Sequence, residues 1–279
     1  MEVFRNRTAI VTGGASGIGK ALGAELVAYG AHVVLADVDG TAAQAAAKEL
    51  TPPDGRGGSI TAVELDVRDV DAVRSVVEAT VERRARLDFM FNNAGISMGG
   101  ETHDLRAEHW DRIIDVNLKG VVNGVLAAYP VMLAQGAGHI VNTSSGAGLA
   151  PTVLTVAYSA TKHAVVGLST SLRPEAARHG VRVSVLCPGA VDTAILDRPP
   201  AAGLPPGSQA MTGREFLGKV GVPMITADRL ARGALRGVAR NQGIIVVPAS
   251  AKLLWYLQRL SPAVVDRVGG LMVRRVLGR

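Results

Sequence analysis

Short apolar runs alternate along the chain with longer segments in which apolar residues recur at helical spacing. A run that is apolar at nearly every position suits a strand in the middle of a parallel sheet, because helices cover both of its faces. This pattern predicts seven strands: Thr8–Val11, Ala31–Ala36, Ser59–Leu65, Phe89–Phe91, Gly138–Asn142, Val181–Leu186 and Gly243–Val247. Helical spacing predicts helices at Gly17–Gly30, Asp69–Arg86, Ala107–Gln135, Ala157–His179 and Ala227–Asn241. The alternation is typical of an α/β fold with a doubly wound, mostly parallel sheet and helices on both faces.

Two segments depart from this alternation. Ala194–Val222 includes a proline- and glycine-rich stretch, Asp197–Gly207, and has no strand pattern, so we predict a lid over a binding site. The last part of the chain also lies outside the alternation. We therefore divide the sequence into one main domain, residues 1–248, and a C-terminal extension, residues 249–279.

Composition favours a folded globule, since 48% of the 279 residues are apolar and only 19% are charged. Cys187 is the only cysteine, and the first residues, Met1–Arg7, lack the apolar core of a signal peptide. We therefore expect a reducing, cytoplasmic setting. No uninterrupted apolar stretch approaches the roughly 20 residues that cross a bilayer. Aromatic residues make up only 4% of the chain and no nucleic-acid reader motif is present, so we do not expect nucleic-acid binding.

The formal net charge of +6 is concentrated in the C-terminal extension. From Ser250 onward, six basic residues stand against the single acid Asp266, which gives +5. From Pro262 onward, apolar residues recur at mostly helical spacing between the basic ones, so we predict a basic amphipathic helix; they are Val264, Val265, Val268, Leu271, Met272 and Val276. Such a helix either rests on anionic lipid and admits an apolar substrate, or packs on the body of the protein or a neighbouring subunit. We favour packing, because apolar stripes are usually buried in protein.

A glycine-rich turn follows the first predicted strand and opens the first predicted helix, with the sequence Thr12-Gly13-Gly14-Ala15-Ser16-Gly17-Ile18-Gly19. Gly13 permits a tight turn. Gly17 and Gly19 let the backbone approach a pyrophosphate and let the helix pack closely, and the helix N-terminus supplies partial positive charge. Although many glycine-rich turns are simply turns, the strand before and the helix after this one predict a Rossmann-type dinucleotide-binding fold for the main domain.

An acidic residue ends the second predicted strand, 18 residues beyond Gly19. The carboxylate of this residue, Asp37, can accept hydrogen bonds from both ribose hydroxyls of an adenosine and would repel a 2′-phosphate. Neither Ser16 nor Val38 offers a cation that would pair with such a phosphate. The pattern favours NAD over NADP, with a plain turn at Asp37–Gly40 as the alternative.

Tyr158 and Lys162 lie four residues apart in a predicted helix and therefore share one face, about one turn apart. The unperturbed pKa of a phenol, about 10, is too high for efficient proton exchange at neutral pH, and a nearby ammonium lowers it. Taken alone, such a pair is more often an exposed ring that packs against a lysine stem. Further along the same helix, Pro174 removes a backbone donor and is expected to kink or restart the helix.

Several motifs in one order make the sequence resemble the short-chain dehydrogenase/reductase family from Thr12 to about Thr193. Thr-Gly-x-x-x-Gly-x-Gly lies at Thr12–Gly19, Asn-Asn-Ala-Gly at Asn92–Gly95 and Tyr-x-x-x-Lys at Tyr158–Lys162. The helix asparagine of the family matches Asn117. Its catalytic serine, 13 residues before the tyrosine, matches Ser145 rather than Ser144.

The resemblance implies a reaction in which a hydride moves between a substrate carbon and the nicotinamide while Tyr158 transfers the proton. It also implies that Ser145 holds the substrate oxygen, that Lys162 binds the nicotinamide ribose, and that Asn117 positions a water linking Lys162 to solvent. The implied catalytic residues are thus Asn117, Ser145, Tyr158 and Lys162. The predicted cofactor-binding residues are Gly13, Ser16, Gly17, Ile18, Gly19, Asp37, Asp66, Val67, Asn93, Ala94, Gly95, Tyr158, Lys162, Pro188, Gly189, Val191 and Thr193.

Four of these residues have a simpler structural interpretation when each is taken singly. Asp66 and Thr193 could cap helices, Asn93 could stabilise a turn, and Asn117 could satisfy a buried backbone gap. The scattered histidines and the single cysteine show no ligand spacing, so we expect no catalytic metal.

In this family the lid shapes the substrate pocket, and here it offers Ile195, Leu196, Leu204, Met211, Phe216 and Leu217. We expect an apolar alcohol or ketone as substrate. By resemblance we also expect a homodimer or homotetramer formed through the helices predicted at Ala107–Gln135 and Ala157–His179. Two alternatives remain: an NADPH-dependent carbonyl reductase, which Asp37 disfavours, and a non-catalytic nucleotide sensor, which the intact catalytic motif disfavours.

Overall fold

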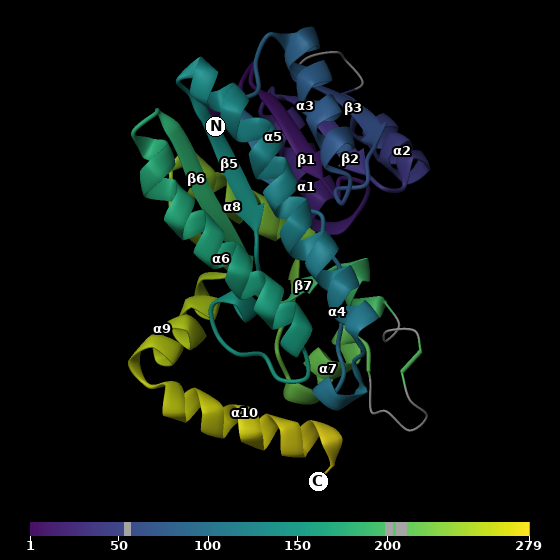
Figure 1. Cartoon of the computed structure of the whole chain (residues 1–279), viewed down its shortest axis with the longest axis vertical. Coiled ribbons are helices and arrows are strands. Elements are labelled where there is room, and N and C mark those ends of the chain that lie inside the picture. Colours follow the sequence, from purple (N-terminus) through teal and green to yellow (C-terminus); the bar gives the residue numbers. More distant parts are fainter. Residues whose placement is uncertain (53–56, 199–202, 205–210, 279) are drawn as a thin grey trace.

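A seven-stranded sheet forms the centre of the computed structural model, which describes residues 1–52, 57–198, 203–204 and 211–278 (Figure 1). The strands are all parallel and lie in the order β3-β2-β1-β4-β5-β6-β9. Their bounds are β1 Thr8–Thr12, β2 His32–Asp37, β3 Ser59–Glu64, β4 Phe89–Asn92, β5 Gly138–Thr143, β6 Val181–Pro188 and β9 Ile244–Val247. This arrangement confirms the predicted doubly wound Rossmann fold.

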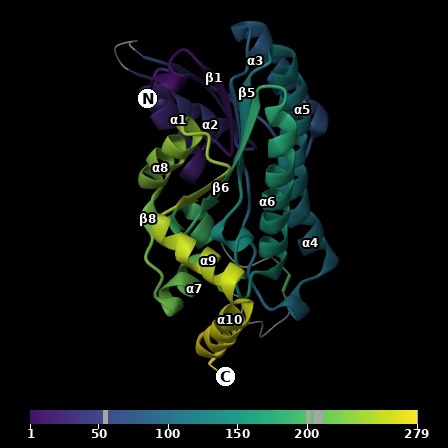
Figure 2. The same cartoon turned by 90° about the vertical axis from the view of Figure 1, so that its left-hand side faces the viewer.

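Helices cover both faces of the sheet (Figure 2). One face carries α1 Gly17–Ala28, α2 Gly40–Leu50 and α8 Ala227–Ala239; the other carries α3 Val70–Arg84, α5 Gly120–Gln135 and α6 Val156–Ala177. Side chains of a strand point alternately to the two faces. On β1, Ala9 and Val11 accordingly join the core beneath α1 and α8, whereas Ile10 joins the core beneath α3 and α5.

Helix α2 is a feature that our sequence analysis missed. Its buried side chains are the small residues Ala43, Ala46 and Ala47, which make a weak apolar stripe. The side chain of Asp39 caps the helix by accepting a hydrogen bond from the Ala42 N–H. That cap, followed by alanines at helical spacing, was the available signal.

The predicted helix over Ala107–Gln135 consists of three parts: α4 Ala107–Ile114, a π-helical turn at Asp115–Lys119, and α5. By length and composition alone, the whole run would suffice to cross a membrane, a test that core helices pass as well. In the fold, α5 packs against β4, β5 and α3, which is the position of a core helix.

Of the two expectations at Pro174, a kink or a restart, the restart is wrong, because α6 continues from Val156 to Ala177. A proline inside a helix removes one backbone hydrogen bond. Val165 and Ala176, on either side of Pro174, are both fully buried.

The predicted lid begins and ends on a small second sheet in which β7 Val191–Asp192 pairs with β8 Ile225–Thr226. Between them lies α7 Gly213–Val220, which starts with a capping box formed by Thr212 and Glu215. Residues 199–202 and 205–210 of the predicted lid lie outside the described residues.

The C-terminal extension forms two helices, α9 Lys252–Leu260 and α10 Pro262–Leu277, so the predicted amphipathic helix is confirmed as α10. Helix α10 lies across one end of the molecule and packs against α9 and α7 (Figure 1). The ammonium of Lys219 on α7 donates a hydrogen bond to the carbonyl oxygen of Val276, 3.2 Å away. Short helices complete the described fold: η1 Glu2–Phe4, η2 Thr102–Asp104, η4 Gly146–Gly148, η5 Ala194–Asp197 and η6 Ala249–Ala251.

Candidate active site

A large cavity, of about 1230 Å³, opens at the carboxyl ends of the central strands. Strand order reverses between β1 and β4, and doubly wound sheets bind ligands at such a switch point. The cavity brings together most of the predicted site residues: Gly13, Ser16, Gly17, Ile18, Asp37, Asp66, Val67, Asn93, Ala94, Gly95, Ser145, Tyr158, Lys162, Pro188, Gly189, Val191 and Thr193. Two predicted residues, Gly19 and Asn117, do not line it.

The glycine-rich loop needs its glycines for different reasons. Gly13 and Gly17 have φ angles of +65° and +51°, in the left-handed region that favours glycine. A Cβ atom on Gly19 would lie 2.0 Å from the carbonyl oxygen of Gly13. Gly19 therefore lets the loop close against the start of α1, whereas Gly13 and Gly17 face the cavity. The open N-terminus of α1 presents its partial positive charge there.

Asp37 joins the end of β2 to the glycine-rich loop. Its Oδ2 accepts a hydrogen bond from the Ala15 N–H at 3.0 Å, and its Oδ1 accepts one from the Asp39 N–H at 3.2 Å. The second contact is the turn that we considered as the alternative. A carboxylate has about four acceptor positions, so these two backbone donors leave room for ligand hydroxyls.

Asp66 lies on the same side of the cavity and forms a bidentate ion pair with Arg68, whose Nε donates to Oδ1 at 3.0 Å and whose Nη2 donates to Oδ2 at 2.6 Å. Hydrogen bonding from Arg68 lowers the pKa of the Asp66 carboxyl. The helix-cap interpretation of Asp66 is wrong, because Asp69 caps α3 through the N–H groups of Asp71 and Ala72.

Asn93 holds the ends of three strands together. Its Nδ2 donates to the Thr12 carbonyl at 3.0 Å, and its own N–H and that of Ala94 donate to Thr12 Oγ1 at 2.9 and 3.0 Å. Thr143 Oγ1 donates to Asn93 Oδ1 at 3.3 Å. Asn93 thus fixes the floor of the cavity from β1 to β5.

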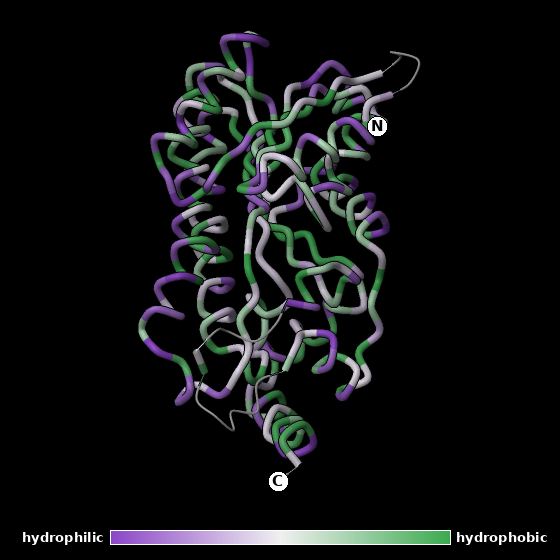
Figure 3. Tube along the Cα trace, turned by 90° about the vertical axis from the view of Figure 1, so that its right-hand side faces the viewer, coloured by the Kyte–Doolittle hydropathy of each residue, from purple (hydrophilic) through white to green (hydrophobic). Residues whose placement is uncertain are grey.

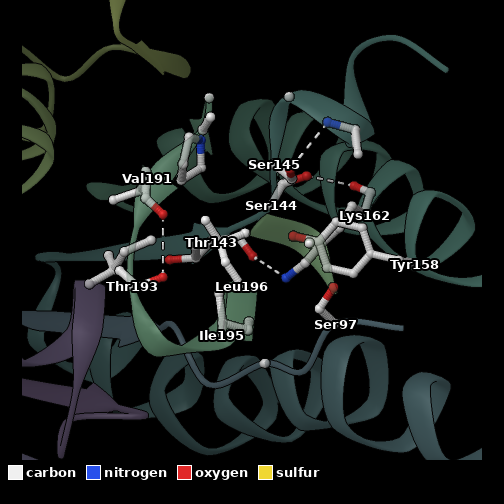
Figure 4. A pocket seen from close by; sticks show the side chains of 18 of the residues that line it. Ser97, Thr143, Ser144, Ser145, Tyr158, Lys162, Val191, Thr193, Ile195 and Leu196 are labelled. Atoms are coloured by element: carbon white, nitrogen blue, oxygen red, sulfur yellow. Dashed lines mark hydrogen bonds between the residues drawn. The ribbon is translucent and has the colours of Figure 1, made fainter. Parts of the chain in front are cut away.

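Ser145, Tyr158 and Lys162 gather on one wall of the cavity (Figure 4). The Lys162 ammonium lies 5.6 Å from the centre of the Tyr158 ring and donates a hydrogen bond to the Thr143 carbonyl at 3.0 Å. Ser145 follows β5 and accepts a hydrogen bond from the Ala147 N–H at 3.1 Å. The tyrosine and lysine are therefore not an exposed surface pair.

Burial dominates the electrostatics of this wall. It raises the pKa of the Tyr158 phenol, while a hydrogen bond with Ser145 opposes that rise. Burial also lowers the pKa of Lys162 to about 8. In the ligand-free protein, burial therefore outweighs the expected lowering of the Tyr158 pKa, because removal from water disfavours the charged form of the phenol.

Asn117 lies in the π-helical turn between α4 and α5 and is completely buried. Its Oδ1 accepts a hydrogen bond from the Ile96 N–H at 2.8 Å, and its Nδ2 donates to the Ile96 carbonyl at 3.0 Å. It thus satisfies a buried backbone gap, as the simpler interpretation held. A Cβ atom on Gly95 would lie 3.2 Å from Asn117 Oδ1 and 3.4 Å from Lys162 Nζ, so this loop passes close to both side chains.

The segment after β6 forms the opposite wall of the cavity. The Gly189 N–H donates to the Val247 carbonyl at 2.8 Å, and Val191 belongs to β7. Thr193 takes the backbone position of an N-cap for η5, but its side chain makes no capping hydrogen bond. The cap interpretation therefore does not account for its hydroxyl, which donates a hydrogen bond to the Val191 carbonyl oxygen at 3.5 Å (Figure 4).

The far end of the cavity is mainly apolar. Of the apolar lid residues predicted to line it, Ile195, Leu196, Phe216 and Leu217 do so, whereas the described Leu204 and Met211 do not. Our sequence analysis missed the wall supplied by the C-terminal helices, which consists of Leu254, Trp255, Val265, Val268, Gly269 and Met272. The available signal was the spacing of Val265, Val268 and Met272 on one predicted helix.

One group of possible metal ligands occurs among the residues that the structure describes. Atoms of Glu101, His103 and Asp104 lie within 4.8 Å of one another near η2. None of the three lines the cavity. This group therefore has no part in the site described above.

Comparison with known proteins agrees with this geometry. A family model described as short chain dehydrogenase matches residues 7–201. SadH of Mycobacterium tuberculosis, whose name places it among oxidoreductases, is 34% identical over 270 residues, covering 96% of this chain and 95% of its own. A short chain dehydrogenase/reductase from Burkholderia phymatum, solved in complex with NAD, has a TM-score of 0.85 and 31% identity over 95% of this chain and 96% of its own. A short-chain dehydrogenase from Sphingobium yanoikuyae, solved in complex with NADPH, has a TM-score of 0.73 and 28% identity over 96% and 95%.

Proposed function

The chain belongs to the short-chain dehydrogenase family, and from this premise we propose that it transfers a hydride between NAD(H) and an apolar secondary alcohol or the corresponding ketone. The observation that carries the proposal is the position of Tyr158, Ser145 and Lys162 on one wall of a cavity that extends to the glycine-rich loop and Asp37. The proposed catalytic residues and the proposed dinucleotide-binding residues thus line the same cavity.

The cavity suits a dinucleotide along its whole length. Gly13 and Gly17 bring backbone N–H groups and the N-terminus of α1 to its surface without side chains. Asp37 and Asp66 line the end that would hold the adenosine, and Thr193 lies toward the end that would hold the nicotinamide. When bound, the nicotinamide supplies or accepts the hydride.

In the proposed reaction, Tyr158 exchanges a proton through its hydroxyl. The raised pKa keeps the phenol neutral in the ligand-free protein, so the hydroxyl carries the proton that a carbonyl oxygen would receive. Ser145 would hold that oxygen in place, and Lys162 would bind the cofactor ribose and favour the phenolate when the reaction runs toward oxidation. Asn117 would support Lys162 through the Gly95 loop.

Asp37 supports NAD rather than NADP as the cofactor. Its carboxylate would repel a 2′-phosphate, and the neighbouring guanidinium of Arg68 is occupied by Asp66. Related structures hold either NAD or NADPH, so this preference rests on the residues of this chain.

The apolar far end of the cavity supports an apolar substrate.

As for assembly, Leu126 on α5 is exposed although the helix is strongly apolar, which supports the homodimer or homotetramer expected through α5 and α6. A cytoplasmic setting fits a site that depends on no disulfide.

The test is a screen of apolar alcohols and ketones, followed by NADH absorbance, with NADH and NADPH titrated in parallel. We expect turnover with NADH and tighter binding of NADH than of NADPH. Tighter binding of NADPH would contradict the cofactor assignment. Binding of NADH without turnover of any alcohol or ketone would favour a nucleotide sensor instead.

A further inference from the structure

The outer surface of α9 and α10 is apolar where most surface helices are polar. The inner face of α10 packs on the protein, with Val265 and Val276 buried, so the packing that we favoured from the sequence holds for that face. The outer stripe, here called the apolar stripe, consists of Leu253, Tyr256, Leu260, Val264, Val268 and Leu271. Leu260 is 85% exposed, Leu253 74% and Leu271 62%. Single exposed apolar residues are normal, but a stripe along two consecutive helices marks an interaction surface.

Cations flank the apolar stripe. Arg259, Arg267, Arg274 and Arg275 are all exposed, and Asp266 is the only acid in the two helices. Within the part of the chain that the structure describes, no carboxylate forms an ion pair with any of the four arginines. Apolar and polar residues alternate around α10, which lies at the extreme end of the molecule (Figure 3). Its outer side therefore presents apolar side chains and unpaired positive charge together.

Two aromatic residues lie at the same surface. The rings of Trp255 and Tyr256 stack with centroids 5.4 Å apart, and the Arg259 guanidinium lies 5.8 Å from the centre of the Trp255 ring. Tyr256 is half exposed, whereas Trp255 also lines the cavity. Amphipathic rings beside cations are typical of surfaces that contact the headgroup region of a membrane.

The apolar stripe reaches the opening of the cavity. Leu254 and Val268 are both exposed to solvent and line the cavity wall. Further in, Val265 and Met272 continue the same apolar surface toward Phe216 on the lid. Residues of α9 and α10 therefore contribute both to the exposed apolar surface and to the apolar part of the cavity wall.

We propose that α9 and α10 dock on the surface of anionic lipid membranes, with the opening of the cavity facing the bilayer. The exposed arginines pair with lipid phosphates while Leu253, Leu260 and Leu271 enter the acyl region. A second copy of this chain is a poorer occupant, because a two-fold contact would bring the unpaired arginines of both copies together. Only the entry of substrate from the bilayer rests on the proposed function; the docking does not.

The first test is sedimentation of the full chain with vesicles of phosphatidylcholine, alone or mixed with phosphatidylglycerol. We expect binding to the anionic vesicles only, with loss of binding at high salt. A surface cation contributes about fivefold to such binding, so R274Q/R275Q should weaken it about 25-fold. L260S/L271S should weaken it while leaving the charge unchanged. The matched control is R83Q/R178Q, which removes two exposed arginines at the ends of α3 and α6 and should leave binding unchanged.

A second measurement locates the contact. The chain has two tryptophans, so in a Trp110→Phe variant the fluorescence reports Trp255 alone. We expect brominated lipids to quench this fluorescence in anionic vesicles and not in neutral ones. Lack of sedimentation with anionic vesicles, or equal weakening by R83Q/R178Q, would overturn the proposal.

The proposal would also be overturned if the protein did not bind vesicles and formed a dimer that L260S/L271S dissociates. That result would assign the apolar stripe to a contact with a second copy of the chain. Vesicle binding needs no turnover. A chain that docks but reduces no ketone would therefore contradict the proposed function alone.

Discussion

Replacement of Asp37 by asparagine removes one negative charge from the adenosine end of the cavity and changes little else. The Asp37 carboxylate accepts hydrogen bonds from the Ala15 and Asp39 N–H groups, 3.0 and 3.2 Å away. An asparagine keeps one acceptor oxygen, which can serve the Ala15 N–H and so hold the glycine-rich loop. What the variant loses is an ionised acceptor for ribose hydroxyls and the repulsion of a 2′-phosphate.

The expected magnitude follows from the strength of hydrogen bonds to charged groups, about 1.5–3 kcal/mol each. Loss of one such bond should weaken NADH binding about 10- to 100-fold, since about 1.4 kcal/mol corresponds to a factor of ten. NADPH binding should be unchanged or stronger, because a charge that opposes the phosphate is removed. The ratio of the two affinities should therefore fall by at least about tenfold.

Fluorescence titration of both cofactors measures this ratio. Asp39→Asn is the matched control, since it removes the same charge two residues further on while an asparagine can still cap α2 through the Ala42 N–H. Thermal unfolding without cofactor checks that neither variant disturbs the loop. An affinity ratio that is the same in Asp37→Asn and the wild type would refute the assignment of Asp37 as the residue that selects NAD.

Three further predictions concern single residues. Gly19→Ala places a methyl group 2.0 Å from the Gly13 carbonyl oxygen. Thermal unfolding should show a decrease of about 3 kcal/mol or more in the free energy of unfolding. Near-wild-type stability with normal NADH binding would contradict this prediction. Lys162 has a folded-state pKa of about 8, below its unfolded value, so the unfolded chain binds more protons above that pH. Stability of the ligand-free protein should thus rise by about 2 kcal/mol between about pH 8 and 10, and urea unfolding of Lys162→Met should lack this rise; an identical profile in both proteins would exclude the buried ammonium. Asn117→Ala strands the Ile96 N–H and carbonyl groups and should cost about 2–4 kcal/mol in urea unfolding, whereas a cost below about 1 kcal/mol would show that water replaces the amide.

The sequence was sufficient to predict the sheet and the shared position of Tyr158 and Lys162, because both leave periodic or spaced signals. Apolar runs such as Val181–Leu186 identify strands buried on both faces, and a four-residue spacing puts Tyr158 and Lys162 on one side of α6. Helix α2 was not predicted, because its buried alanines form only a weakly apolar stripe.

Other features depend on tertiary structure and leave no local signal. The pKa of Tyr158 is set by how completely the assembled fold removes it from water, which no spacing reveals. The wall of the cavity that α9 and α10 supply depends on how α10 packs against α7, held in part by the hydrogen bond from Lys219 to the Val276 carbonyl. The different roles of two glycines also depend on the folded loop: Gly13 faces the cavity, whereas Gly19 lets the loop close against α1.

Tyr158→Phe is the sharpest test of whether the Tyr158 hydroxyl exchanges the proton of the reaction. Steady-state ketone reduction and NADH affinity would be measured for the variant and the wild type, with a substrate found in the screen. We expect kcat to fall by about 10²- to 10⁴-fold while the Kd for NADH changes little, because the ring and its packing remain. A variant that keeps kcat within a few-fold of the wild type would show that another group supplies the proton.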